Sequence, residues 1–247
     1  MVKPLVSPMD LGQSKPSILL SYFEHVSIIN LPDRVDRRKE MEQELLKLGL
    51  APQAKAAEFF PAIRPSRKGD WPSLGARGGF LSHYTVLKNA RDRKLRNVLV
   101  LEDDCEFASE LIDSHAQIVS VLSKTPWDLL YLGHASQPPT FKPLVRIPSH
   151  EPLMLAHLYA VNRTILDRLV TFLEQVMQRP AGHPDGGPQF FDGALNMFRA
   201  LNKDVATLIA APSLASQRSS RSDITGRWFD RVPVLRNAVN RLRQLTR

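Results

Sequence analysis

The segment from Val98 to Asp104 constrains the fold of this chain more than any other. Four apolar residues, ending at Leu101, run directly into the acids Glu102, Asp103 and Asp104. The apolar run is too short for a helix and has the composition of a strand buried on both faces. The acids therefore fall at the carboxyl end of a core strand, where open α/β sheets bind ligands. Adjacent carboxylates repel one another, and a hard divalent cation with phosphate as its other partner compensates them. A solvated acidic turn is the alternative.

Predicted strands and helices alternate along the chain. Apolar runs predict strands at 25–31, 98–101, 129–132, 155–161 and 205–209. Helical periodicity predicts helices at 33–48, 75–94, 110–123, 164–177 and 192–201. This alternation predicts an α/β fold, with one domain over 25–225 and a mostly parallel central sheet flanked by helices. The proline-rich stretches 51–75 and 134–152 are expected to be connections, and residues 1–24 an irregular extension.

Composition bears on the compartment. The chain has 247 residues and is 43% hydrophobic, which is ordinary for a protein with a real core. No apolar run approaches the roughly 20 residues of a membrane span. Residues 1–15 lack the apolar core of a secretory signal. Only one cysteine, Cys105, is present, so no intrachain disulfide can form. We therefore expect a cytoplasmic protein.

Positive charge is concentrated near the C-terminus. Between residues 216 and 247, eight arginines face two aspartates, so most of the net charge of +8 lies there. Neither zinc-finger cysteine pairs nor an aromatic-rich basic strand accompanies it, so we expect no nucleic-acid partner. In a predicted basic helix at 226–247, Leu235, Val239 and Leu242 share one face. This helix either lies on an anionic membrane surface or packs on the domain with its arginines solvated.

Four segments, taken together and in order, resemble glycosyltransferase family 25. They are Ser27–Arg38, Gly78–His83 with the form Gly-x-x-x-Ser-His, Leu99–Asp104, and the pair Phe191-Asp192. This family includes bacterial lipopolysaccharide sugar transferases and collagen galactosyltransferases. The resemblance implies a GT-A-like fold, a nucleotide-sugar donor, a divalent cation and inversion at the anomeric carbon. The composition favours the bacterial branch, in which galactose or glucose would move from a UDP-linked donor to a glycan or lipid-linked saccharide.

The resemblance implies a metal and donor site at the first and third segments. Asp104 is the first candidate ligand for Mn²⁺ or Mg²⁺ and Glu102 the second, because a cation there would neutralise the leaving nucleoside diphosphate. Asp103 is a candidate donor contact. Asn30 and the backbone of Leu31 are candidates for reading the nucleotide.

Several arginines are candidates for the diphosphate, because guanidinium groups fit phosphate well. Arg34 and Arg38 are preferred to Arg37, and a solvated first helical turn is the alternative for all three. The segment 212–224, which includes Gln217, Ser222 and Asp223, resembles the closing segment of the family, and this resemblance implies a loop that orders over donor and metal. There we expect Arg218 and Arg221 to face phosphate.

Histidines and later aspartates supply the remaining candidates. His83 either supports the sugar, orients a carboxylate or is a hydrogen-bonded structural histidine. His134 and His157 could each offer a neutral nitrogen to the metal. Inverting transfer needs a general base, and Asp192 is the first candidate, with a helix N-cap as its alternative. The second candidate, Asp185, also fits a turn.

Two other functional classes remain open. The acidic strand end also resembles that of a phosphoacceptor receiver domain, but Gly133 stands where the phosphorylated aspartate would be. A nucleotide- or glycan-binding protein without catalysis is the other alternative. Release of a nucleoside diphosphate from a nucleotide sugar would separate all three.

Overall fold

The computed structural model describes residues 18–49, 57–136 and 142–218. The described residues form a seven-stranded sheet in the order β2-β1-β3-β7-β5-β8-β6 and a two-stranded sheet of β4 and β9. The strands are β1 His25–Asn30, β2 Ala57–Pro61, β3 Asn97–Glu102, β4 Cys105–Phe107, β5 Leu129–Gly133, β6 Lys142–Ile147, β7 Leu158–Asn162, β8 Thr207–Ala211 and β9 Ala215–Gln217. The helices are α1 Ile18–Tyr22, α2 Val35–Lys47, α3 Leu74–Asp92, α4 Ser109–Leu122, α5 Arg163–Gln178 and α6 Phe191–Leu201.

The α/β fold and the mostly parallel sheet are confirmed. β1 pairs in parallel with β2 and β3, and β5 pairs in parallel with β8. β7 lies antiparallel between β3 and β5, and β6 runs antiparallel along the edge. Because β1 and β3 are parallel neighbours, their last residues, Asn30 and Glu102, lie at the same end of the two strands. The first and third family-like segments therefore meet there.

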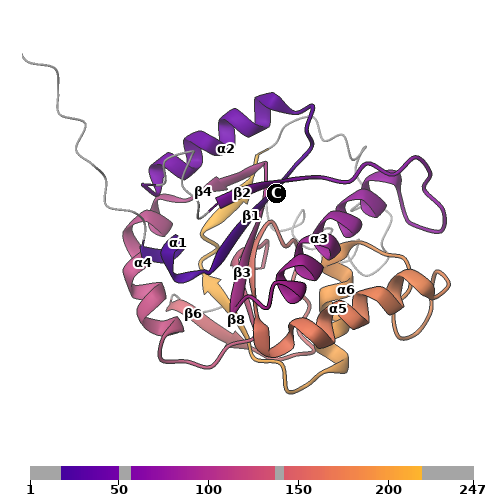
Figure 1. Ribbon diagram of the computed structural model, residues 1–247. Helices are drawn as coiled ribbons and strands as arrows, with labels where there is room; N and C mark the ends of the chain where they lie inside the picture. The colour runs from indigo at the N-terminus through magenta and orange to yellow at the C-terminus, as the bar shows by residue number, and fades with distance from the viewer. Residues whose placement is uncertain (1–17, 50–56, 137–141, 219–247) are drawn as a thin grey trace, which may run out of the picture.

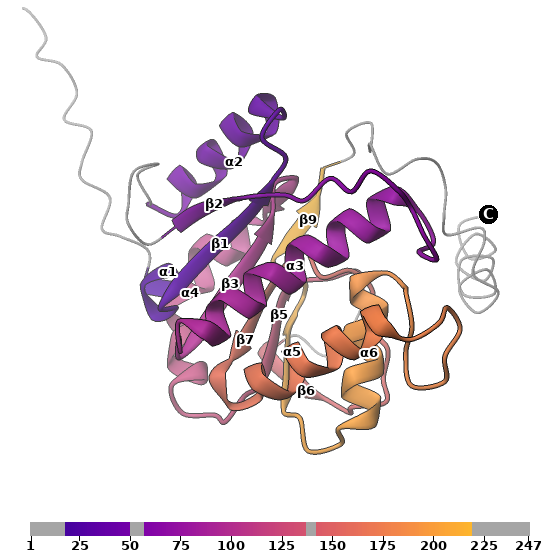
Figure 2. The same ribbon diagram turned by 45° about the vertical axis from the view of Figure 1, so that its right-hand side comes forward.

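Helices cover both faces of the sheet (Figure 1). In Figures 1 and 2, α3, α5 and α6 lie on one face, and α1, α2 and α4 lie on the other. Strand β3 serves both cores: Val98 and Val100 belong to the cluster under α3, α5 and α6, whereas Leu99 and Leu101 belong to the opposite cluster. Burial on both faces explains why the strand is apolar at every position before the acids.

The helices predicted at 75–94, 110–123, 164–177 and 192–201 are confirmed to within two residues, as are the strands at 98–101 and 129–132. The helix predicted from 33 begins at Val35, and Arg34 rather than Asp33 occupies its N-cap position. The strand predicted from 155 begins at Leu158, and the last core strand runs over 207–211.

Two segments expected to be connections contain edge strands, which corrects the prediction. β2 and β6 form the two edges of the large sheet. Edge strands tolerate proline and show weak alternation, because one side of the ladder is unpaired. Pro61 ends β2 and Pro143 lies within β6, so proline content concealed both strands.

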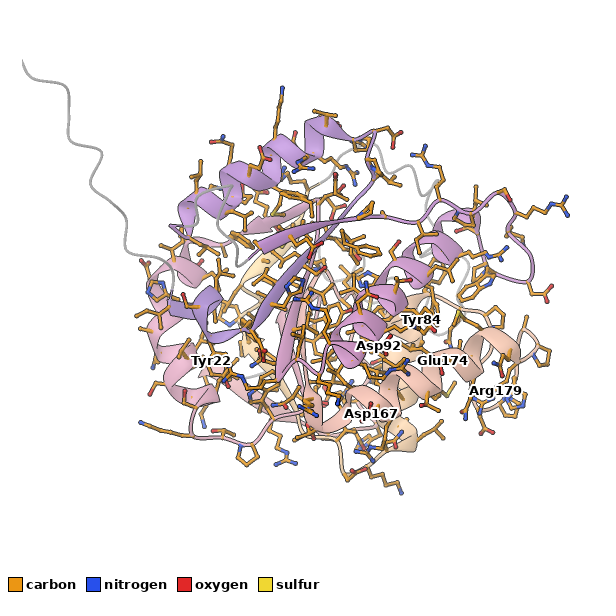
Figure 3. All side chains as sticks on the ribbon, in the orientation of Figure 1. Tyr22, Tyr84, Asp92, Asp167, Glu174 and Arg179 are labelled. Atoms are coloured by element: carbon orange, nitrogen blue, oxygen red, sulfur yellow. The ribbon has the colours of Figure 1, made fainter. Side chains whose placement is uncertain are left out.

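Residues 18–22 are helical rather than irregular, which corrects that part of the predicted extension. Leu19 and Leu20 are each 1% exposed. At the end of α1, Tyr22 Oη donates to the Leu122 carbonyl (3.3 Å) and accepts from Trp127 Nε1 (3.1 Å); Tyr22 is labelled in Figure 3. This short helix is therefore part of the folded domain.

No helix in the described ranges is long and apolar enough to cross a membrane. The predicted basic helix at 226–247 and Arg221 lie outside the described residues.

Candidate functional site

A pocket of about 250 Å³ opens at the carboxyl ends of β1 and β3. Its walls are the ends of these strands, the loop 62–65, the first turns of α3 and the three acids 102–104. Glu102 is the last residue of β3, and Asp103 and Asp104 form the turn into β4. The acids thus lie at the carboxyl end of a core strand, as predicted.

Asp103 is fixed by β1 and α2. Its Oδ2 accepts a hydrogen bond from Asn30 Nδ2 (2.8 Å), and its Oδ1 accepts one from Arg37 Nη1 (3.0 Å). The Asn30 amide also donates to the Arg34 carbonyl (3.2 Å). Asn30, a candidate for reading the nucleotide, thus supports an acid, while Leu31 lines the pocket.

Asp104 is the least compensated of the three acids. Arg37 Nη1 lies 3.6 Å from its Oδ2, but its buried Oδ1 has no hydrogen-bond partner among the described residues. Burial, together with the charges of Glu102 and Asp103, raises the pKa of Asp104 to about 7 against the opposing effect of Arg37. An unpartnered carboxylate oxygen in a negative pocket is what a divalent cation requires. Asp104 and Glu102 can therefore offer carboxylate oxygens to a cation. Within residues 18–49, 57–136 and 142–218 no cluster of three or more His, Cys, Asp or Glu side chains is placed to hold a metal ion, so phosphate and water oxygens would have to complete its coordination.

Glu102 is held from two sides. Its Oε1 lies 3.2 Å from His83 Nε2, and its Oε2 accepts a hydrogen bond from Gln217 Nε2 (2.8 Å). Burial alone would raise the pKa of Glu102, but the hydrogen bond and charge of His83 and the Gln217 amide outweigh burial and lower it. Glu102 therefore stays ionised in a fixed orientation.

His83 acts here as a support for Glu102. Its Nδ1 is 3.0 Å from Tyr159 Oη, and its ring stacks on Phe191 at 4.3 Å between centroids and 9° between planes. Of the roles considered from the sequence, this geometry fits the orientation of a carboxylate. Phe191 comes from the fourth family-like segment, so the stack brings that segment to the acids.

The glycine and the serine of the Gly-x-x-x-Ser-His segment are explained by the close contact of α3 with the loop 62–65. A Cβ on Gly78 would lie 2.7 Å from the Ile63 carbonyl oxygen, so only glycine lets α3 approach the loop 62–65 so closely. Ser82 Oγ accepts from Ile63 N (2.8 Å) and donates to the Gly78 carbonyl (2.7 Å). Gly79, by contrast, faces open space in the pocket. The segment thus builds one wall of the pocket.

The three candidate arginines point in different directions. Arg37 reaches the acids and lines the pocket. Arg34 forms an ion pair with Asp36 (2.8 Å). Arg38 pairs with Glu42 (3.3 Å) and lies over the Phe59 ring at 4.4 Å. Which arginine faces the acids depends on how α2 is rotated against the sheet. The sequence does not reveal this rotation, so it gave no ground for preferring Arg34 and Arg38 to Arg37.

Asp192 lies in the first turn of α6 and is partly buried. Its Oδ1 accepts from Gly193 N (2.8 Å) and its Oδ2 from Leu155 N (3.2 Å). Burial and the charge of Glu102 raise the pKa of Asp192, against these two hydrogen bonds. Phe190 occupies the N-cap position of α6, so the N-cap alternative does not describe Asp192. The other candidate base, Asp185, is exposed in a turn with His183.

His134 and His157 are buried behind the site. Their Nε2 atoms lie 2.8 and 3.0 Å from the carbonyls of Ala210 and Ala215, which can only accept, so each Nε2 carries the proton. Burial lowers the pKa of both rings. A Cβ on Gly133 would lie 2.5 Å from His157 Nε2, which explains glycine at that position.

Gln217 and Arg218 close over the acid turn. Besides the Gln217 bond to Glu102, Arg218 N donates to the Asp104 carbonyl (2.8 Å) and Arg218 Nη2 to the Cys105 carbonyl (3.0 Å). Arg218 Nη1 pairs with Glu40 of α2. Arg218 was expected to face phosphate; it holds the turn instead. Gln217 belongs to the family-like segment that we expected to order over donor and metal; its bond to Glu102 itself was not predicted, because only the pairing of β9 with β4 brings the two residues together.

The chain is similar in sequence to a known protein family. Residues 23–154 match the model of glycosyltransferase family 25, described as a lipopolysaccharide biosynthesis protein. The matched range includes three of the four family-like segments, and Asp192 lies beyond it.

Curated relatives include both active and inactive members by name. Procollagen galactosyltransferase 2 of Homo sapiens is 32% identical over 129 residues, covering 45% of this chain and 21% of the relative. The probable inactive glycosyltransferase 25 family member 3 of Bos taurus is 30% identical over 129 residues, covering 45% and 22%. The chain therefore spans about a fifth of the length of these relatives.

A solved structure shares the fold. The glycosyltransferase involved in glycosylation of the major capsid of PBCV-1 superposes with a TM-score of 0.51 at 9% identity, covering 80% of this chain and 94% of that one. This likeness supports a GT-A-like architecture. On the family match over more than half of its length, the chain belongs to glycosyltransferase family 25.

Proposed function

We propose that this protein is a glycosyltransferase that moves a hexose from a nucleotide sugar to a saccharide acceptor. The observation that carries the proposal is the buried, unpartnered Oδ1 of Asp104 beside a pocket of about 250 Å³. Since the relatives include proteins named inactive and proteins named galactosyltransferases, the activity is argued from the site rather than from the family.

The pocket has the two-sided character that a nucleoside diphosphate sugar requires. Its apolar side, formed by residues such as Leu31, Ile63 and Pro65, suits a nucleobase. Its other side carries the acids and Arg37. A UDP-linked donor would place its base among the apolar side chains and its diphosphate toward Asp104.

Asp104 and Glu102 would hold Mn²⁺ or Mg²⁺. The ion would supply charge neutralisation for the nucleoside diphosphate as it departs, and phosphate oxygens and water are its usual remaining ligands. His83 and Gln217 fix the carboxylate of Glu102, and Asn30 and Arg37 fix that of Asp103. The acid turn is thus oriented before any ligand binds, and such preorganisation is where enzymes gain most electrostatic stabilisation.

Asp192 is the proposed general base for an inverting transfer. Its raised pKa favours proton acceptance at neutral pH. Each of its oxygens accepts one backbone hydrogen bond and retains a second lone pair. It would take the proton of the acceptor hydroxyl while that oxygen attacks the anomeric carbon from the side opposite the diphosphate.

The hexose is proposed to be galactose or glucose, and the acceptor a glycan or lipid-linked saccharide. The family description as a lipopolysaccharide biosynthesis protein supports an acceptor of this class. A membrane contact through the basic tail would suit a lipid-linked acceptor, but the tail lies outside the described residues.

The test is release of nucleoside diphosphate from a panel of nucleotide sugars, with Mn²⁺, with Mg²⁺ and with a chelator. We expect metal-dependent turnover with at least one UDP-hexose, loss of turnover in Asp104→Asn, and full turnover in the control Asp113→Asn on the exposed face of α4. Metal-dependent binding of UDP without any turnover would favour the non-catalytic alternative. No binding of any nucleotide would overturn the proposal.

A further inference from the structure

A second groove lies on the other side of the first turns of α3. Its volume is about 390 Å³, and it runs between Trp71, Arg77 and the residues Met177–Pro180 at the end of α5. The start of α3 and the end of α5 lie at the same side of the molecule in Figures 1 and 2. Tyr84 Oη of α3 donates to Glu174 Oε1 of α5 (3.0 Å), and this pair, labelled in Figure 3, holds the helices together beside the groove.

Two guanidinium groups line this groove without a carboxylate partner. Arg77 Nη1 donates to the Arg67 carbonyl (2.7 Å). Arg179 donates to Gln175 Oε1 (3.0 Å) and to the Asp185 carbonyl, and Figure 3 shows it at the end of α5. Neither forms an ion pair with any residue that the structure describes. Neutral acceptors hold both side chains in place and leave their charges uncompensated.

The charged side chains in and around the groove carry a net positive charge. The segment leading to Trp71 carries exposed Arg67 and Lys68, which also lack ion pairs within the described ranges. Asp70 lines the groove and offsets one positive charge, and the exposed Asp185 lies in the loop that holds Arg179. The four basic side chains, Arg67, Lys68, Arg77 and Arg179, therefore outnumber the two acids, and a bound anion would be stabilised.

The groove adjoins the donor pocket through α3 and a series of aromatic rings. Gly75 and Gly79 of this helix line the pocket, whereas Arg77 lines the groove. Trp71 packs on Phe80 (4.6 Å between centroids), and Phe80 contacts Phe191 (6.0 Å), the ring that stacks on His83. The groove and the residue that holds Glu102 are thus connected by packed side chains.

We propose that this groove binds an anionic sugar unit, carrying a carboxylate or a phosphate, in the acceptor of the transferase. Guanidinium groups recognise both anions with paired hydrogen bonds. Met177, Pro180 and Pro188 supply apolar surface for the faces of the sugar ring. That the anionic sugar belongs to the acceptor rests on the proposed function, whereas binding of the anionic sugar does not.

The test is a titration of the isotope-labelled full chain, followed through its backbone amide resonances. The probes are galacturonate, glucose 6-phosphate, glucose and inorganic phosphate at constant ionic strength. We expect both anionic sugars to shift the amides of residues 69–71 and 177–179, and to bind about tenfold more tightly than glucose. The variant Arg77→Gln/Arg179→Gln should lose at least that tenfold.

Arg163→Gln is the matched control, because Arg163 is another arginine that donates to a carbonyl, that of Lys94 (3.2 Å), and it is exposed. It should bind all probes as the parent does. Equal binding of glucose and galacturonate, or unchanged binding by the double variant, would overturn the proposal. Inorganic phosphate binding as tightly as glucose 6-phosphate would overturn the assignment to a sugar.

A UDP titration with Mg²⁺ separates this proposal from the proposed function. UDP should shift residues of the donor pocket equally in the parent and the double variant. If UDP fails to bind while anionic sugars still occupy the groove, the proposed function fails and the groove remains an anionic-sugar site. In an active enzyme, the double variant should raise the KM for an anionic acceptor about tenfold and leave the KM for the donor unchanged. A rise in both would show a general defect rather than an acceptor subsite.

Discussion

The three acids of the site differ in how many hydrogen-bond partners hold their carboxylates. Asp103 has two hydrogen-bond donors and Glu102 has two partners, but one oxygen of Asp104 has none among the described residues. A buried carboxylate with one oxygen unpartnered is costly when it ionises, even with Arg37 3.6 Å from the other oxygen. Ionised Asp104 therefore lowers the stability of the fold, a cost that residues which bind ligands commonly carry and that suits the role proposed for it.

This imbalance predicts a pH-dependent stability. With a folded pKa of about 7 and an unfolded value near 3.8, Asp104 binds more protons in the folded state between these pH values. Without metal, stability should fall as pH rises from about 4 to 7 and then level off. Asp104→Asn should therefore be more stable than the parent at pH 7.5, by on the order of 2 kcal/mol, and nearly equal at pH 4. Chemical denaturation at both pH values measures this, and Mg²⁺ with UDP should stabilise only the parent.

Asp192 and Asn196 allow a comparison of chemistry with structure on one helix. Asp192→Asn should reduce transfer by roughly 10²- to 10⁴-fold and change donor affinity little, because a base acts mainly in the transition state. Asn196 makes two hydrogen bonds to the backbone of Leu153 (2.8 and 2.7 Å). Asn196→Ala should lower the melting temperature and keep most of the turnover per folded molecule. If Asp192→Asn behaves like Asn196→Ala, Asp192 is a structural residue.

At the scale of elements, the sequence predicts the helices and strands that have a clear local pattern of apolar residues. It does not predict the order of the strands in the sheet or the contacts that depend on this order. β3 was predictable because it is apolar on both faces, and α3, α4, α5 and α6 because their apolar periodicity is clear. The insertion of antiparallel β7 between β3 and β5 leaves no local signal. The same holds for the direction of Arg37, which depends on how α2 rotates against the sheet. Gln217 is 115 residues from Glu102, and only the resemblance of its segment to the closing segment of the family brought it to attention.

Adjacent glycines in α3 should respond in opposite ways. A Cβ on Gly78 would meet the Ile63 carbonyl at 2.7 Å, whereas a Cβ on Gly79 would meet nothing within 4 Å. Gly79→Ala should raise stability by about 0.5–1 kcal/mol, as expected inside a helix. Gly79→Leu should keep the fold but fill the pocket and weaken UDP binding. Gly78→Ala should lose stability despite its better helix propensity. Melting temperatures and UDP affinities of the three variants test the assignment of α3 as a pocket wall.

At the scale of the whole molecule, α6 links distant segments through a buried cation. Arg199 is 0% exposed and donates to the carbonyls of Pro148 (2.8 Å) and Glu151 (2.9 Å) and to Thr207 Oγ1 (3.1 Å). Burial lowers the pKa of its guanidinium. These bonds join the loop after β6, the first residue of β8 and the helix that carries Asp192.

Replacement of Arg199 by an uncharged residue should lower the stability of the whole domain. Arg199→Met leaves two carbonyls and a hydroxyl without their donor, at about 1–3 kcal/mol for each group left buried and unsatisfied. We expect the free energy of unfolding to fall by at least 3 kcal/mol in denaturant titrations. Arg168→Met provides the control, because Arg168 forms an exposed ion pair with Asp204 and should change stability by less than about 1 kcal/mol.

The closure of the acid turn by Gln217 and Arg218 has a consequence for how the protein is made. The acids belong to the first half of the chain, so a nascent chain carries Glu102 and Asp104 long before β9 emerges from the ribosome. Until then Glu102 lacks the Gln217 amide and the turn lacks its bonds to Arg218. The ability to hold a nucleotide should therefore arrive late in synthesis. A nascent chain stalled with Ser213 just emerged should not retain UDP, whereas one stalled with Arg218 well outside the ribosome should.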